Sequence, residues 1–392
     1  MAFFVRGPKG TYKMHGVCRS HCMRLLTMTK VFILCPQVVP PNPACPAPRP
    51  RGMAGLGALI LLLIIAVLPL PAQAMKTTDA LGRQVTIPTP VRRIVALNSD
   101  SLEILRTLKA QDRIVGVYAE ILREPTFWGT LTNLPKTGGW RTPNLEAIAD
   151  LAPDLVLTYS RNPGEQFDRK MAALGIPVLR LDFYKLATLE DEVKRLGELL
   201  GKIDEARSFC DWHAGHLALI RDRVAEAPHH PAVYIESYSD LSTVGPTSGA
   251  HEMCLLAGGR NIAADTVLPY PKITPEWVLA QNPEIIVKAA AWSNGYQANG
   301  ASSFNARRDA IMKRPVWSTI PAVQNGRVHV MDSAIWTGPR ALIGVAWLAR
   351  WFYPQRFADV DPNHWHGEYL QRFQGIAYQG IYTSDSLLKE TR

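Results

Sequence analysis

The chain has 392 residues, of which 47% are hydrophobic and 20% charged, a composition typical of a globular protein long enough for two domains. Its formal net charge of +9 comes almost entirely from residues 1–74, which hold eight Lys and Arg and no Asp or Glu, so the remainder carries only +1. Because the basic charge is confined to this leader, it gives no support to nucleic-acid binding.

The leader contains an apolar run at residues 56–70. Arg49 and Arg51 precede this run, and the small residues Ala72-Gln73-Ala74 follow it. Positive residues, an apolar stretch and an A-x-A site in this order indicate a secretory signal peptide over residues 52–74. The run is nearly long enough to be a membrane anchor. Its interruption by prolines and the A-x-A site favour cleavage near Ala74 and a periplasmic protein.

Residues 1–52 resemble an over-long start assignment, because Met53 would begin a conventional signal peptide. We therefore do not interpret the four cysteines of this part as a metal site. No cysteine directly follows the apolar run, so a lipid-anchored form is not expected. The mature chain from Met75 keeps Cys210 and Cys254, which can form one disulfide or none.

Residues 75–186 are assigned to an N-terminal α/β lobe. A hairpin is predicted over 76–88, and residues 119–139 are predicted to be rich in loops. Aliphatic runs alternate with helical segments, which predicts a mainly parallel sheet covered on both faces. The runs predicted as strands are 94–97, 114–118, 155–159 and 178–181.

Residues 187–228 break this alternation and are predicted to form a helical connector. Apolar residues recur at spacings close to three and four from Leu189 to Ile220. Gly201 is predicted to end one helix, and Asp204 to lie near the start of a second one of roughly 22 residues and about 33 Å.

Residues 229–392 are assigned to a C-terminal α/β lobe. Ser248 is predicted to cap a helix that ends at Gly258-Gly259. The part after residue 353 is polar and aromatic and is expected to wrap the surface of this lobe. The other elements predicted are strands at 233–235, 285–287 and 328–331, a polar loop at 293–303 and a helix at 341–352.

One pattern occurs once in each lobe. Glu146 lies seven residues before Pro153, and Glu276 lies seven residues before Pro283. An acidic residue and three aliphatic residues follow each proline, which predicts a short helix, a proline that cannot continue it and a buried strand. Two copies a domain's length apart indicate that both lobes repeat one plan.

These segments resemble the substrate-binding proteins of ABC importers for iron chelates and vitamin B12. The resemblance covers roughly residues 92–355 and rests on the order and spacing of several pieces. They are N-L-E-x-I-x-x-x-x-P-D-L-V at 144–156, P-E-x-V-L-A-x-x-P-E-I-I at 275–286, R-R-I-V-A-L at 92–97, L-G-I-P-V at 174–178, L-P-Y-P-K-I at 268–273 and N-G-R-V-H-V at 325–330.

The resemblance implies a fold of two mainly parallel α/β lobes joined by one long helix, with a ligand cleft between them. It implies a monomer that delivers a small-molecule metal chelate to an ABC permease dimer and its ATPase, and meets the membrane only through the permease. No catalytic residue and no cofactor are expected, because the metal arrives within the chelate. The motifs of a hydrolase nucleophile, a P-loop and a dinucleotide-binding turn are absent from the sequence.

A protein-bound metal is not favoured. Cys210, His213 and His216 lie at i, i+3 and i+6 of the connector, a helical spacing that can bind zinc. They lie on the stripe that we expect to be packed, so we favour packing over a metal site. The roles of His364 and His366 stay open.

Aromatic residues gather at or near the predicted strand ends. In open α/β sheets, ligands bind beyond the carboxyl ends of the strands. Aromatic side chains there suit a bulky, partly apolar ligand, although each one alone could serve packing. The candidates are Trp140, Tyr159, Tyr184, Tyr238, Tyr270, Trp292 and Trp336.

Two arginines complete the predicted ligand site. Arg141 adjoins Trp140, and Arg340 follows a Gly-Pro turn that would present it to an anion. The alternative for Arg340 is an ion pair with a local acid. The pieces around Trp140 and Tyr270 resemble vitamin B12-binding members, except that those have Trp in place of Tyr270.

Because Arg340 favours an anionic ligand, we expect a ferric siderophore. A corrinoid is the main alternative, followed by haem or a molybdate-type oxyanion. Outside transport, the alternative is a sensory or enzymatic domain of similar fold.

Glu146 and Glu276 have two interpretations. Each lies near the start of a helix, where the dipole favours a carboxylate. In the resembled family, paired glutamates of this kind meet arginines on the two permease subunits, so the resemblance implies a role in permease docking.

Overall fold

The computed structural model describes residues 73–291 and 295–385. Residues 52–72 of the predicted signal peptide, the four N-terminal cysteines and Trp292 lie outside these ranges. In the two ranges, no helix combines the length and the apolar character that a membrane span requires. The domain boundaries given above stay a prediction.

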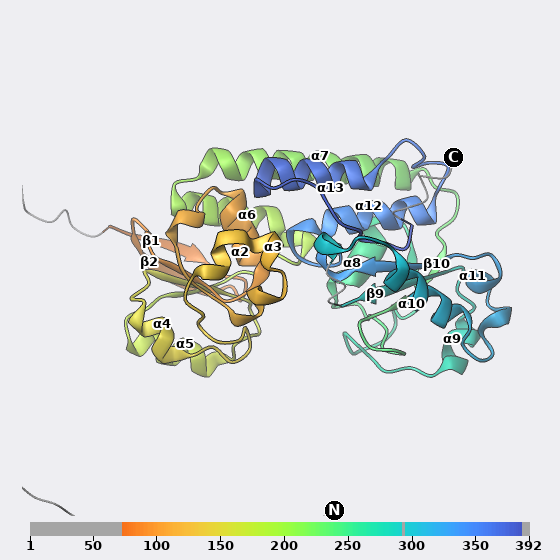
Figure 1. The fold of residues 1–392 in the computed structure, drawn as a ribbon, viewed down its shortest axis with the longest axis horizontal. Coiled ribbons are helices and arrows are strands. Elements are labelled where there is room, and N and C mark those ends of the chain that lie inside the picture. Colours follow the sequence, from red (N-terminus) through yellow and green to blue (C-terminus); the bar gives the residue numbers. More distant parts are fainter. Residues whose placement is uncertain (1–72, 292–294, 386–392) are drawn as a thin grey trace, which may run out of the picture. The chain divides into compact units, whose positions relative to one another are not determined.

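A parallel sheet forms the centre of the first lobe (Figure 1). Its strand order is β4-β3-β5-β6, and each neighbouring pair is parallel. The strands are β3 (Ile94–Ala96), β4 (Ile114–Val117), β5 (Leu155–Thr158) and β6 (Val178–Arg180). The helices of this lobe are α2 (Ser99–Thr107), α4 (Leu145–Asp150) and α5 (Glu165–Ala173), with a short turn η1 (Gln111–Arg113).

The predicted hairpin is present as β1 (Gln73–Thr78) and β2 (Gln84–Thr89). The two strands pair only with each other, so they form a separate antiparallel sheet and not an edge of the parallel one. Asp79 closes the turn, because its Oδ1 accepts hydrogen bonds from the backbone N–H groups of Leu81 and Arg83, each at 2.9 Å. Cleavage after Ala74 would leave β1 from Met75 onwards.

The segment predicted to be rich in loops contains three short helices, η2 (Ala119–Arg123), α3 (Pro125–Trp128) and η3 (Gly129–Asn133). Pro125 begins α3, where its missing N–H costs nothing, and Gly129 ends it with a φ of 54°. None of the three is long enough to show a helical period in the sequence, which is why the pattern indicated loops.

The connector consists of two helices, α6 (Leu186–Leu200) and α7 (Ile203–Ala225). Gly201 separates them in the left-handed conformation, with a φ of 65°. The 23-residue α7 contacts α2 of the first lobe and α12 (Ala341–Phe352) of the second lobe. The long helix between lobes is therefore present (Figure 1).

The second lobe repeats the sheet of the first. Its strands are β7 (Ala232–Glu236), β8 (Arg260–Asn261), β9 (Ile285–Ala290) and β10 (Val328–Asp332), in the order β10-β9-β7-β8. When β7 is matched with β3, β9 with β5, β10 with β6 and β8 with β4, the two orders are identical. The predicted fold class, two parallel α/β lobes, is confirmed.

The helices of the second lobe surround this sheet. Ser248 caps α8 as predicted, because its Oγ accepts a hydrogen bond from the N–H of His251. The elements are α8 (Gly249–Leu256), α9 (Pro275–Gln281), η4 (Gly295–Gln297), α10 (Ser302–Met312), η5 (Trp317–Thr319), α11 (Pro321–Gln324), η6 (Ser333–Ile335), η7 (Gly338–Arg340) and α12, followed by α13 (Pro362–Tyr369) and the π-helix η8 (Leu370–Gln374).

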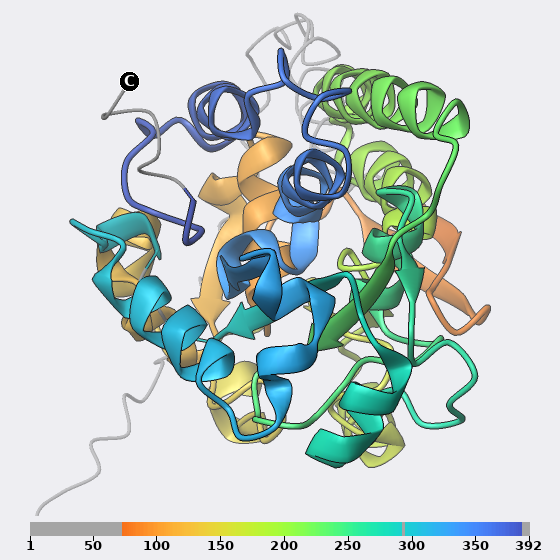
Figure 2. The ribbon, with the colours of Figure 1, turned by 90° about the vertical axis from the view of Figure 1, so that its right-hand side faces the viewer.

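The C-terminal part does more than wrap the second lobe, and that expectation was wrong. Gln374 of η8 donates to the backbone carbonyl of Glu103 at 3.1 Å and to Thr107 Oγ1 at 2.9 Å, both on α2 of the first lobe. Arg106 of α2 donates back to Gln374 Oε1 at 2.8 Å. Figure 2 shows α13 and α12 beside α7. This segment therefore joins the two lobes a second time.

The two lobes share one hydrophobic core. A continuous buried cluster includes Ile94 of the first sheet, Val233 of the second and Leu348 of α12. Cys210 and Cys254 are both buried in it and unpaired with each other. No disulfide between them is needed to hold the lobes together, because the apolar surface is shared.

Candidate ligand site

The repeated pattern is built twice in atomic detail. Asn144 Oδ1 caps α4 by accepting from the N–H of Ala147 at 3.1 Å, and Thr274 Oγ1 caps α9 by accepting from the N–H of Trp277 at 3.2 Å. Each cap is followed two residues later by an exposed glutamate, Glu146 or Glu276. Helix, cap and exposed acid thus recur at matching positions of both lobes, while the docking role of the glutamates stays a prediction.

Three of the predicted aromatic residues meet on the first lobe. The ring centroids of Trp140 and Tyr159 lie 5.9 Å apart at an interplanar angle of 89°. Those of Tyr159 and Tyr184 lie 5.5 Å apart at 74°. The exposed Arg141 guanidinium lies 4.4 Å above the Trp140 ring. We call Trp140, Tyr159 and Tyr184 the aromatic cluster; edge-to-face contacts of this kind are favourable.

Tyr159 at the centre of the cluster is held by a buried carboxyl group. Its hydroxyl donates to Asp100 Oδ2 at 2.8 Å, and Ser99 Oγ donates to Asp100 Oδ1 at 3.1 Å. Asp100 is 3% exposed, and this burial raises its pKa to about 6 despite the hydrogen bond from Tyr159. Asp100 also approaches Gly338 of the second lobe, where a Cβ would lie only 2.7 Å from Oδ1. Asp100 therefore joins the cluster to the junction of the lobes.

The second lobe contributes two exposed tyrosines. Tyr238 is 43% exposed and Tyr270 is 55% exposed. Burial raises the pKa of the Tyr184 phenol, and the nearby Asp182 and Tyr270 raise it further. Among the described candidates on the second lobe, Tyr238 and Tyr270 are the ones with exposed side chains.

Trp336 and Arg340 are placed differently from the other candidates. Trp336 is 6% exposed and Arg340 is 4% exposed. Arg340 Nη2 donates to Glu103 Oε1 at 2.8 Å, and its guanidinium lies 4.5 Å above the Phe127 ring. Arg340 therefore forms an ion pair, as in the alternative considered above, but its acidic partner belongs to the other lobe. Arg340 holds α2 against η7.

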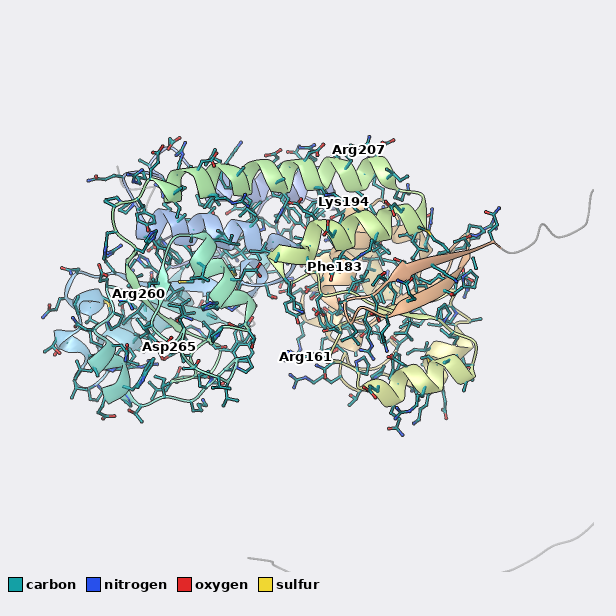
Figure 3. All side chains as sticks on the ribbon, turned by 180° about the vertical axis from the view of Figure 1, so that it is seen from behind. Arg161, Phe183, Lys194, Arg207, Arg260 and Asp265 are labelled. Carbon is teal, nitrogen blue, oxygen red and sulfur yellow. The ribbon has the colours of Figure 1, made fainter. Side chains whose placement is uncertain are left out.

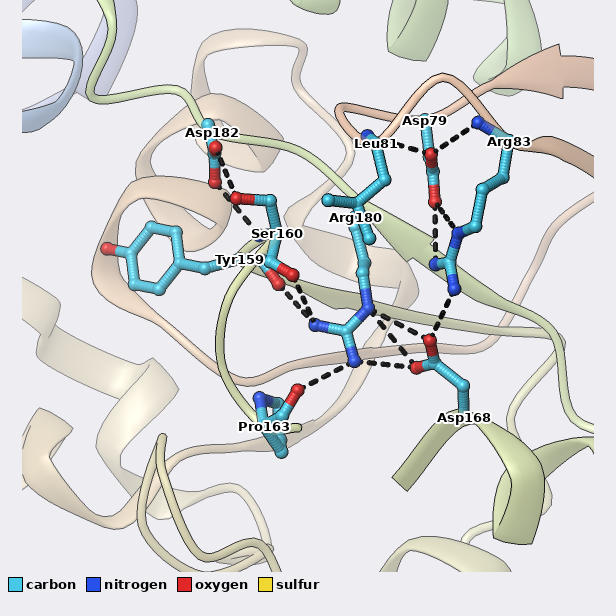
Figure 4. Close-up of polar contacts among 9 residues, drawn as sticks. All are labelled: Asp79, Leu81, Arg83, Tyr159, Ser160, Pro163, Asp168, Arg180 and Asp182. Carbon is cyan, nitrogen blue, oxygen red and sulfur yellow. Dashed lines mark hydrogen bonds and ion pairs between the residues drawn. The ribbon is translucent and has the colours of Figure 1, made fainter. Parts of the chain in front are cut away.

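Arg180, which no sequence pattern indicated, organises the loop after β5 (Figure 4). Arg180 is 1% exposed. Its Nη1 donates to the backbone carbonyl of Tyr159 at 2.5 Å and its Nη2 to that of Pro163 at 2.7 Å. Asp168 accepts from Arg180 Nη2 at 2.7 Å and neutralises the buried charge. A strand position gives no local signal of this role, since Arg180 is the last residue of β6.

Arg161 is a second residue that no sequence pattern indicated. It lies in the loop that Arg180 holds, and its side chain is exposed. Its positive charge lowers the pKa values of the Tyr184 and Tyr270 phenols, against the larger effect of burial, which raises them. In Figure 3 the Arg161 side chain projects from the first lobe towards the second.

No resident metal site is found in residues 73–291 and 295–385, where no three His, Cys, Asp or Glu side chains are grouped to hold an ion. His213 is fully buried, and its Nδ1 lies 2.9 Å from Glu190 Oε1. The His216 ring packs 4.3 Å from that of Trp365, and the buried His366 ring packs 4.3 Å from that of Tyr382. His213 and His216 of the connector and His366 of α13 therefore contact neighbouring side chains in this structure.

Two surface hollows in the described part of the chain lie away from the aromatic cluster. One of about 700 Å³ adjoins α13 and includes His364 and Tyr378. The other, of about 340 Å³, lies among α6, α7 and α8 and includes Glu190 and Glu252. Neither is lined by a residue of the aromatic cluster.

The aromatic cluster offers hydrogen-bond donors and not anionic ligands. Burial raises the pKa of the phenols of Tyr159 and Tyr184, so these hydroxyls remain protonated at neutral pH, and that of Tyr159 donates to Asp100. Protonated phenols and guanidinium groups donate to oxygen acceptors. The arrangement can therefore stack flat surfaces and bind oxygen-rich anions.

Comparison with known proteins identifies the family to which this chain belongs. The family model described as periplasmic binding protein matches residues 94–335. The molybdate-binding protein MolA of Haemophilus influenzae is 28% identical over 334 residues, which cover 77% of this chain and 91% of MolA. The vitamin B12-binding protein of Yersinia pestis is 26% identical over 222 residues, covering 56% of this chain and 76% of that protein.

Solved structures of similar proteins share the fold of this chain. The molybdate-bound MolA structure has a TM-score of 0.65 at 25% identity and covers 78% of this chain and 99% of MolA. The structure of the binding protein FepB from Veillonella parvula has a TM-score of 0.67 at 24% identity, covering 79% of this chain and 99% of that one, and shows a shared fold. The chain belongs to the periplasmic binding protein family, as a substrate-binding protein of the ABC-importer type.

Proposed function

We propose that the protein binds an anionic metal chelate in the periplasm, with a ferric siderophore as the ligand, and delivers it to an ABC permease dimer and its ATPase. The observation that carries this proposal is the aromatic cluster, flanked by the exposed Arg141 and Arg161. Flat aromatic faces suit the rings and ligand arms of a chelate. The arginines suit its negative charge.

The chemistry of the cluster supports a chelate over a bare metal ion. Hard cations need oxygen ligands that are ionised or strongly polar. The phenol of Tyr159 is held neutral by burial, and its hydroxyl already donates to Asp100 Oδ2. A ferric ion that arrives already wrapped in its own oxygen ligands requires no such donors, so the protein needs no cofactor.

A molybdate-type oxyanion is the second candidate, because the relative MolA is named for molybdate and aligns with most of this chain. A tetrahedral oxyanion would use the same hydroxyl and guanidinium donors without the aromatic faces. A corrinoid is the third candidate, because another relative is named for vitamin B12. The corrinoid would use the aromatic faces and leave the arginines unpaired.

The proposal also includes docking on the permease through Glu146 and Glu276. Glu146 and Glu276 are exposed on the first turn of α4 and α9, the matching helices of the two lobes. We propose that each meets an arginine of one permease subunit, so that a two-lobed protein fits a two-fold partner. The protein would act as a monomer and catalyse no reaction. Surface charges of this kind set encounter rate and orientation more than affinity.

The test is a tryptophan fluorescence titration of the purified chain from Met75, because Trp140 lies in the aromatic cluster. The ligands are a ferric tris-catecholate, a ferric tris-hydroxamate, cyanocobalamin, haem and molybdate. We expect saturable quenching by a ferric chelate, and loss of that quenching on replacing Trp140 by Phe while binding measured by calorimetry persists. Binding of molybdate alone would replace the siderophore with the second candidate.

A further inference from the structure

The loop between β5 and α5 is held more firmly than a surface loop requires. Thr158 Oγ1 donates to the carbonyl of Asn162 at 2.8 Å. Asp182 accepts from the N–H of Ser160 at 2.9 Å and from its hydroxyl at 2.6 Å. The backbone carbonyls of Tyr159 and Pro163 accept hydrogen bonds from Arg180 (Figure 4). Together these hydrogen bonds hold the backbone between residues 158 and 163.

The charge of Arg180, which holds the loop, is neutralised by an ion pair with Asp168. Burial would raise the pKa of Asp168, but hydrogen bonds from Arg180 and Arg83 outweigh it and hold that pKa below its usual value. Arg83 Nη1 lies 2.7 Å from Asp168 Oδ2 and Arg83 Nη2 lies 2.7 Å from Asp79 Oδ2. A buried guanidinium is tolerated only with such partners. The structure thus anchors this loop to β6, α5 and the hairpin turn.

Arg161 stands at the tip of this loop and differs from its neighbours. Among residues 73–291 and 295–385, no acidic side chain forms an ion pair with it, whereas the exposed Arg169 of the same lobe lies 3.6 Å from Glu165. Its side chain projects from the first lobe towards the second (Figure 3), and its charge lowers the pKa values of the Tyr184 and Tyr270 phenols, one from each lobe. A guanidinium on a fixed backbone, beside neutral hydroxyl donors, is preorganised for an oxygen anion.

We propose that Arg161 is the residue that selects ligands by negative charge, with the loop held by Arg180 setting its position and Tyr184 and Tyr270 donating beside it. This proposal rests on the proposed function and names the ligand chemistry of the same site. An anionic oxygen of the ligand accepts from the guanidinium, and the ring of Tyr159, two residues earlier in the loop, contacts the ligand's flat face. An uncharged chelate of the same size uses only the second contact.

The test compares two ferric chelates that differ in charge. A ferric tris-catecholate is trianionic, whereas a ferric tris-hydroxamate is uncharged. Calorimetric titrations of the parent chain, Arg161→Gln, Arg161→Lys and the control Arg169→Gln are run with both. Because a hydrogen bond to a charged group is lost, Arg161→Gln should weaken the catecholate by about ten- to hundred-fold. It should change the hydroxamate by less than about three-fold, and Arg169→Gln should change neither.

Two further readouts separate a ligand contact from a structural effect. Arg161→Lys should restore part of the catecholate affinity, because charge returns without the planar fork. Raising the salt concentration should weaken the catecholate in the parent chain more than in Arg161→Gln. Equal binding of the catecholate by parent and Arg161→Gln would overturn the proposal, as would equal losses for both chelates. Unchanged binding with lost uptake would assign Arg161 to the permease instead.

Failure of the proposed function gives a different result. If the parent chain binds neither chelate, the siderophore proposal is wrong, and molybdate is titrated into the same variants. Weaker molybdate binding by Arg161→Gln then keeps Arg161 as the charge-selecting residue. If the parent chain binds none of these three ligands, both proposals are wrong.

Discussion

Removing the carboxylate of Glu103 should destabilise the protein strongly, because Glu103 is the acid that pairs the two lobes. Glu103 is 3% exposed and lies on α2 of the first lobe. It accepts from Arg340 Nη2 at 2.8 Å and from the hydroxyl of Tyr369 at 2.9 Å, both in the C-terminal half of the chain. Glu103→Ala would leave the Arg340 guanidinium buried without its counterion.

The magnitude follows from that burial. Removing one partner of a buried ion pair costs about 3–5 kcal/mol of unfolding free energy, because the remaining charge is not solvated. The face of the nearby Phe127 ring partly stabilises the Arg340 charge by a cation–π contact. We therefore expect Glu103→Ala to lower the unfolding free energy by about 3 kcal/mol, near the lower end of that range. Glu103→Gln keeps an acceptor for Tyr369 and should cost less than Glu103→Ala.

Urea unfolding of the chain from Met75, followed by tryptophan fluorescence, measures this loss. Glu226→Ala is the matched control, because its side chain is 80% exposed and lies 3.5 Å from Arg356, and an exposed pair contributes at most about 1 kcal/mol. Because the buried core runs through both lobes, a single transition is expected. If Glu103→Ala lowers the unfolding free energy no more than Glu226→Ala does, the pair does not hold the lobes together.

Further predictions concern the site and its partners. Trp140→Ala should weaken chelate binding by about 1–3 kcal/mol, measured by calorimetry, since it removes a face of the aromatic cluster; an unchanged affinity would misplace the site. The pKa of Asp100 is about 6 in the folded chain against an ordinary 3.8, so the folded state binds the extra proton, and this stabilisation, present below pH 4, is lost as the pH rises through 6. The loss is about 3 kcal/mol at most, and Asp100→Asn should remove this part of the pH dependence in urea unfolding from pH 4 to 7. Glu146→Ala with Glu276→Ala should slow or abolish uptake while calorimetric ligand affinity is kept, and uptake at the original rate would disprove docking through this pair. N-terminal sequencing of the exported protein should begin at Met75; an intact apolar segment would show an anchor instead.

Much of the fold follows from local patterns in the sequence. In each lobe, a proline after a short helix, followed by an acidic residue and three aliphatic residues, predicted the matching strands β5 and β9. Gly201 predicted the break between α6 and α7, since a left-handed position favours glycine. Tyr159 and Tyr184 were found because strand ends can be located from the runs that precede them, and Trp140 because it precedes the helix of the repeated pattern. Each of these signals lies within a few residues of the feature that it predicts.

The partners of buried charges were decided only by the tertiary structure. Arg340 pairs with Glu103, 237 residues away, so the sequence around Arg340 could present it only as a free guanidinium or as the partner of a local acid. Arg180 reads as the end of a buried strand, yet its guanidinium holds the loop that carries Arg161. Gln374 lies in a segment with no strong period and contacts α2 of the other lobe. Residue type and period determine which face of an element is buried, but which distant group meets a buried charge depends on how the lobes pack, and a single sequence does not record that.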